Sequence, residues 1–78
     1  MNANEMIDLR NRLPFVPFTI HLRDGAAVRV EQPYVLATGR NSPECVIYES
    51  ADRIRFVAYR DIAEITTAPE NGSSRQGS

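Results

Sequence analysis

Apolar and polar residues alternate along residues 18–31, on both sides of an Asp-Gly turn signal. A period of two residues is typical of half-buried strands, so the stretch predicts a β-hairpin. A three-residue loop at residues 23–25 pairs Ile20 with Val28 and keeps the apolar side chains on one face, whereas a two-residue loop mixes the faces. The favoured register also places Gly25 at the left-handed position of the turn, where a side chain would be strained.

The N-terminal residues show helical periodicity instead. Asn2 and Glu5 have the spacing of a capping box, with Asn4 as an alternative N-cap. Pro14 ends the pattern, because the residue before a proline is pushed toward extended geometry. We predict a helix over residues 3–12, which must dock on the sheet because so short a helix is marginal alone. Its expected apolar stripe consists of Met6, Ile7, Leu9 and Leu13.

Beyond the first hairpin, Pro33 is expected to close the second strand or to mark a bulge, because proline cannot donate to a ladder. Ile62 and Ile65 are expected core anchors near the end of the pattern. The expected elements are an extended segment at 34–37, a loop at 39–43, a hairpin of 45–48 with 54–59, a short turn at 59–62 and a last strand at 63–67.

The second hairpin is apolar on both of its faces. Placing Ile47 opposite Ile54 and Cys45 opposite Phe56 makes one face wholly apolar. The other face then carries Val46, Tyr48, Arg53, Arg55, Val57 and Tyr59. This second face is unusually apolar for a strand pair exposed to water. We therefore predict an interface between copies of the chain at Val46, Tyr48, Val57 and Tyr59, or, as the alternative, a face covered by the N-terminal helix.

These elements predict one small domain over residues 1–67. It is mainly β with one N-terminal helix, and the expected architecture is a small, strongly bent five-stranded antiparallel barrel. Residues 68–78 are polar and carry no apolar anchor, which predicts a disordered tail.

The composition and net charge narrow the classes of molecule that the protein is expected to bind. Across 78 residues the net charge is −1, and this balance argues against an indiscriminate nucleic-acid or membrane binder. All nine basic residues are Arg, which we attribute to codon usage. The sequence has no charged segment followed by an apolar run, so it predicts no signal peptide. No apolar run approaches the ~20 residues of a membrane span. We expect a cytoplasmic protein without membrane contact.

Candidate chemistry is sparse. His21 lies on the polar phase of the first strand, with no nucleophile or carboxylate at a readable spacing, and is expected at the surface. Cys45 falls on the inward phase and should behave as a small apolar residue. A single Cys excludes an internal disulfide and, with one His, leaves no zinc site. No enzymatic activity, metal or cofactor is expected.

The order of helix, P-F-T-I-H-L-R-D-G-A-A-V-R-V, second hairpin, Y-R-D-I and final strand resembles the Sm-like fold of the Hfq family of bacterial RNA chaperones, over residues 5–67. The opening P-F-x-P-F-x-I-x-L-x-D-G is also similar to that of small bacterial proteins with no assigned activity. The resemblance implies a barrel of Sm-like or SH3-like type, whose subunits join edge to edge at the strands equivalent to the second hairpin and the last strand.

The Hfq resemblance also implies a candidate RNA site. Members of that family contact RNA through a Tyr-Lys-His motif, and the matching positions here are Tyr59, Arg60 and Asp61. Asp61 replaces the histidine with an acid, which opposes phosphate binding. Arg53 and Arg55 complete the candidate RNA contacts, with Tyr59 and Arg60.

The leading hypothesis is a non-enzymatic barrel that acts through protein–protein contacts, as a homo-oligomer with a further protein partner of unknown identity. The alternative is an Sm-like RNA-binding protein.

Overall fold

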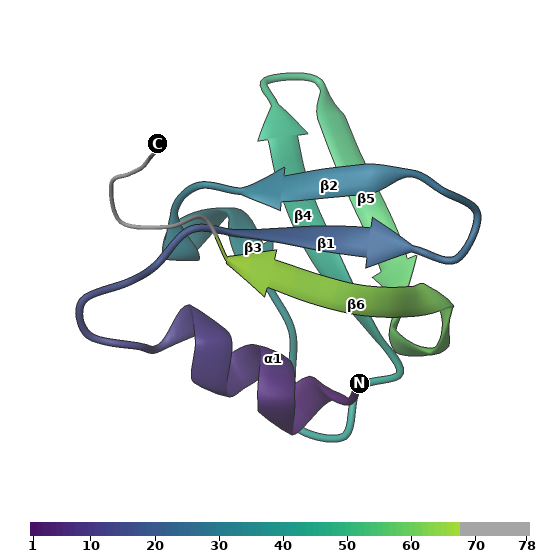
Figure 1. Ribbon diagram of the computed structural model, residues 1–78. Coiled ribbons are helices and arrows are strands. Elements are labelled where there is room, and N and C mark those ends of the chain that lie inside the picture. Colours follow the sequence, from purple (N-terminus) through teal and green to yellow (C-terminus); the bar gives the residue numbers. More distant parts are fainter. Residues whose placement is uncertain (68–78) are drawn as a thin grey trace, which may run out of the picture.

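The computed structural model describes residues 1–67, and the predicted tail at 68–78 lies outside the described residues. The described chain has one helix, six strands and two 3-10 turns (Figure 1). They are α1 (Ala3–Arg10), β1 (Phe18–Leu22), β2 (Ala27–Val30), η1 (Pro33–Val35), β3 (Leu36–Ala37), β4 (Glu44–Ser50), β5 (Arg53–Ala58), η2 (Tyr59–Asp61) and β6 (Ile62–Thr67).

The strands form two antiparallel sheets of three strands each, in the orders β2-β1-β6 and β3-β4-β5. Figure 1 shows the first sheet crossing in front of the second, with α1 beside them. The prediction of a mainly β domain with one N-terminal helix is confirmed. The pairing found in residues 1–67 is divided between two sheets and does not show a single closed five-stranded barrel.

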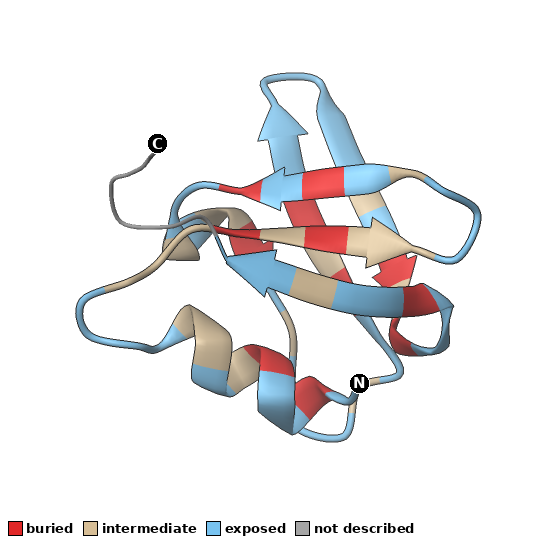
Figure 2. Ribbon diagram, viewed as in Figure 1, coloured by how far each residue is buried: buried red, intermediate tan, exposed pale blue. Residues whose placement is uncertain are grey.

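The core lies between the two sheets and under the helix (Figure 2). β1, β2 and β4 alternate buried with less buried positions where they face the core, as a strand with one face on a core does. The buried side chains are Ala3, Met6, Phe18, Ile20, Val28, Val30, Leu36, Cys45, Ile47, Val57, Tyr59 and Ile62. Ile65 packs against this cluster while partly exposed, so both expected anchors of the last strand contact the core.

The first hairpin has the predicted register. Ile20 lies opposite Val28, and the Leu22 amide donates to the Ala26 carbonyl at 2.8 Å, which closes the three-residue loop. Gly25 has a φ of +97°, as the turn requires. The Asp24 carboxylate accepts from the Ala26 amide at 2.9 Å and ties the loop to the start of the second strand.

The helix begins with the predicted capping box. The Asn2 side chain accepts from the Glu5 amide, and the Glu5 carboxylate accepts from the Asn2 amide. The helix ends earlier than predicted, at Arg10. Leu13 is therefore beyond the helix and 95% exposed, so its assignment to the apolar stripe was wrong. Ala3, which the periodicity did not include, is buried instead.

The segment after Pro33 differs from the prediction. Residues 33–35 form the 3-10 turn η1, and only Leu36 and Ala37 are paired as a strand. Pro33 occupies the first position of the turn, where its fixed φ suits a helix and its missing N–H costs nothing. The Leu36 amide donates back to the Pro33 carbonyl. The extended conformation predicted for 34–37 was therefore wrong over its first half.

Candidate interaction surface

The second hairpin is paired one residue away from the predicted register. Cys45 lies opposite Val57 and Tyr48 opposite Ile54, with an irregularity between Tyr48 and Ser50. A slip of one residue moves every side chain of a strand to the other face. The predicted pairs of Ile47 with Ile54 and of Cys45 with Phe56 were therefore wrong, and β5 presents the opposite face to the core.

This register splits the predicted interface residues. Val46 and Tyr48 face outward as expected, and Tyr48 is 51% exposed. Val57 and Tyr59 are only 3% and 5% exposed, because they are part of the core, so their assignment to an open surface was wrong. The sequence did carry a signal for the correct face, because both phases of 53–59 contain large apolar residues, but alternation alone cannot choose between them.

The outward side of the second sheet is an apolar face. Ile54 and Phe56 are 59% and 66% exposed, and they lie opposite Tyr48 and Val46 in the ladder. We call these four residues, Val46, Tyr48, Ile54 and Phe56, the outer face. Pairs that lie directly opposite in an antiparallel ladder share one side of the sheet, so the four side chains form one continuous surface.

The helix does not cover this surface. Ala3 and Met6 of α1 are buried in the core between the sheets, and the Arg10 guanidinium donates to the Leu36 carbonyl at 3.5 Å. With α1 in this position, the outer face stays open. The predicted alternative, a helix over the face of Val46, Tyr48, Val57 and Tyr59, is wrong for Tyr48, which is 51% exposed, whereas Val57 and Tyr59 are buried in the same core cluster as Ala3 and Met6.

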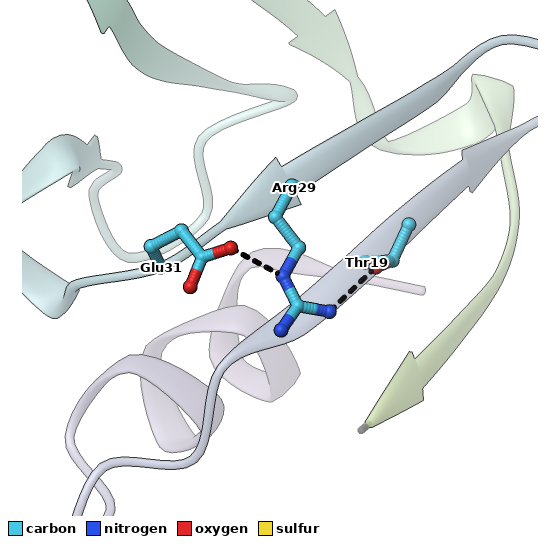
Figure 3. Close-up of polar contacts among 3 residues, drawn as sticks. All are labelled: Thr19, Arg29 and Glu31. Atoms are coloured by element: carbon cyan, nitrogen blue, oxygen red, sulfur yellow. Dashed lines mark hydrogen bonds and ion pairs between the residues drawn. The ribbon is translucent and has the colours of Figure 1, made fainter.

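The outward side of the first sheet is polar by contrast. Figure 3 shows the Arg29 side chain on that side, where it donates to Glu31 at 2.8 Å and to Thr19 at 3.2 Å. His21 lies on the same side and its Nε2 is 2.8 Å from the Thr66 hydroxyl, a surface position as predicted. The outward side of the first sheet is therefore polar, whereas the outward side of the second sheet is apolar.

Tyr59, the residue that follows β5, is buried and has hydrogen-bond partners of its own. The Tyr59 hydroxyl donates to the Thr38 hydroxyl at 2.6 Å, and the Tyr59 amide donates to the Pro43 carbonyl at 3.0 Å. Burial raises the pKa of the Tyr59 phenol, and burial likewise raises the pKa of the neighbouring Cys45 thiol. A thiol held in its protonated form is a poor nucleophile. Cys45 is fully buried, as predicted.

The structure brings the candidate RNA contacts together only in part. Tyr59 is buried and has no face free for stacking, and Arg55 pairs with Glu49 at 2.9 Å. Arg53 and Arg60 are exposed, Arg53 at the start of β5 and Arg60 in η2 beyond its end. Arg60 lines the same hollow as Tyr59, whereas Arg53 lies at the far end of the strand.

A hollow of about 480 Å³ lies beside η2, lined by Met1, Asn2, Ser42, Pro43, Glu44, Ala58, Tyr59 and Arg60. Its hydroxyl groups are already engaged, since Ser42 donates to the Glu44 carbonyl and Tyr59 to Thr38. This lining offers no pairing of a nucleophile with a base. Within residues 1–67, no three His, Cys, Asp or Glu side chains gather as a metal site.

No helix in the described part of the chain is both long and apolar enough to cross a membrane. No protein-family model matches the chain, and comparison with curated proteins and with solved structures found no match either. The chemistry of the surface is therefore the basis for any functional assignment.

Proposed function

We propose that the protein is a small non-enzymatic domain that acts through protein–protein contacts, and that it self-associates. The observation that carries the proposal is the outer face, where Tyr48, Ile54 and Phe56 are each more than half exposed. Contiguous exposed apolar surface of this kind is typical of interaction sites.

We further propose that the fold is a small barrel of SH3-like or Sm-like type. Three features support this. β1 pairs with both β2 and β6, which places the first and last strands side by side. The turn η2 directly precedes β6, and η1 interrupts what would otherwise be one long bent strand from β2 to β3. The same order of elements underlies the resemblance to the Hfq family.

The size of the outer face predicts a weak contact. Burying a whole aromatic side chain removes about 150–250 Å² of its surface from water. The exposed parts of Tyr48, Ile54 and Phe56 therefore amount to roughly 300 Å² in total. Burying this area on two copies would remove roughly 600 Å² from water, whereas stable specific interfaces bury about 1,200–2,000 Å². A reversible complex is therefore expected rather than a permanent one.

Sedimentation of the unmodified protein between micromolar and submillimolar concentrations tests the proposal. The average mass is expected to rise with concentration. Phe56→Asp should abolish the rise without unfolding the protein, because Phe56 is 66% exposed. Leu13→Asp is the matched control: Leu13 is a large apolar residue 95% exposed between α1 and β1 and is not part of the outer face, so its replacement should leave the mass unchanged. A monomer at every concentration would refute the proposal.

RNA binding remains the competing hypothesis, and the same samples test it. Titration with mixed oligonucleotides at two salt concentrations should show no binding if the domain contacts only protein. An affinity that falls with salt would instead establish a nucleic-acid site, since phosphate contacts release counterions.

A further inference from the structure

β5 is an edge strand of the second sheet, and its free side is open to pairing. The order β3-β4-β5 leaves one side of Arg53–Ala58 without a partner strand in the described chain. Edge strands are usually protected by lysine, proline or an inward-pointing charge. β5 contains no lysine or proline, and its charges are Arg53 and Arg55, on the same phase as Val57, so a partner strand must avoid setting a like charge against them. Its two outward side chains, Ile54 and Phe56, are the most exposed members of the outer face.

We propose that two copies of the chain pair β5 with β5 in antiparallel fashion, with Phe56 opposite Phe56 of the second copy at a two-fold axis. The inference rests on the proposed self-association and names its geometry. It would join the two second sheets into one continuous sheet and make the two outer faces continuous. The backbone groups of the free edge would gain partners, and Ile54 and Phe56 would gain apolar neighbours.

The side chains of β5 select this register. In an antiparallel ladder, opposite residues point to the same side, so registers that oppose outward with inward residues are excluded. Placing Ile54 opposite Ile54 sets Arg53 against Arg55 twice. Placing Ile54 opposite Phe56 sets Arg55 against Arg55. Like charges directly opposite each other destabilise a sheet.

With Phe56 opposite Phe56, no arginine within residues 54–58 faces another. Arg55 lies opposite Val57, and Ile54 lies opposite Ala58. A further shift of the same parity would pair only residues 56–58 in place of residues 54–58 and would shorten the ladder. The chosen register is therefore the longest overlap that both matches the faces and avoids like charges.

β6, an edge strand of the first sheet, is less suited to this contact. Ala63, Glu64, Thr66 and Thr67 are its exposed residues, and none is a large apolar side chain. A pairing of β5 with β6 of another copy would leave Phe56 without an apolar neighbour from the partner strand. Such a pairing is also head to tail, so it leads to rings or filaments rather than to a closed dimer.

Cysteine cross-linking tests the register directly. Opposite residues have Cβ atoms about 4.5–5.5 Å apart, close to the geometry of a disulfide. Phe56→Cys should therefore form a covalent dimer on mild oxidation. Ile54→Cys is the matched control, since two copies of position 54 would be four residues out of register, roughly 13 Å apart. A mixture of Ile54→Cys with Ala58→Cys should cross-link, whereas neither should do so alone. The native Cys45 is fully buried, and the unmodified protein gives the background.

The outcomes separate the two proposals. Covalent dimers of Phe56→Cys, together with mixed dimers of Ile54→Cys and Ala58→Cys, would support the β5–β5 pairing. Dimers of Ile54→Cys alone would overturn the register. If the unmodified protein associates but none of these variants cross-links, the pairing is wrong while self-association stands. If the unmodified protein sediments as a monomer at all concentrations, both proposals fail.

Discussion

Replacing Gly25 by alanine isolates the conformational cost of the first turn. Gly25 has a φ of +97°, and a Cβ added there would meet no heavy atom within 4 Å. The substitution therefore creates no clash, and its whole effect comes from the backbone. A left-handed conformation costs a residue with a Cβ about 1–2 kcal/mol. The stiffer unfolded chain offsets about 0.4–1 kcal/mol of that cost.

The net loss expected for Gly25→Ala is about 1 kcal/mol, which lowers the melting temperature of a domain of this size by roughly 4–8 °C. Thermal unfolding followed by circular dichroism measures it. Gly39→Ala is the control, because an added Cβ there also meets nothing within 4 Å and no positive φ is required. Its melting temperature should stay the same or rise slightly. If both variants melt at the same temperature, the backbone explanation of the turn is refuted.

Two further predictions concern the buried network at the end of β5. Tyr59→Phe should destabilise the protein by about 1 kcal/mol in urea unfolding, because it removes a buried hydroxyl donor to Thr38 at 2.6 Å; an unchanged midpoint would contradict this. Stability should also fall in alkali. Burial raises the pKa of Cys45 above its ordinary 9.0 and that of Tyr59 above 10.0. The unfolded chain therefore loses these protons first, so the contribution of these two groups to stability is constant below about pH 8 and falls as the pH rises through 9 and 10. Cys45→Ala should show a shallower fall, and an identical pH profile would argue against the thiol's part in it.

The sequence was sufficient wherever one local signal pointed to one answer. In the first hairpin, only one phase of each strand is apolar, so a single register buries Ile20 and Val28 together, and Gly25 marks the turn. The capping box is equally local, since Asn2 and Glu5 satisfy each other's backbone groups within one turn. The mainly β class, the position of η2 and the burial of Cys45 also followed from pattern.

Tertiary structure decided the second hairpin. Both phases of residues 53–59 contain large apolar side chains, so alternation could not choose which face to bury, and the ladder has an irregularity between Tyr48 and Ser50. The Tyr59 hydroxyl donates to Thr38, which is far away in the sequence, and Tyr59 is buried together with Val57 in the core. This register also changed the candidate surface, because Ile54 and Phe56 are exposed where Val57 and Tyr59 were expected to be. A one-residue register depends on contacts between segments that lie far apart in the chain, and only the folded arrangement brings those segments together.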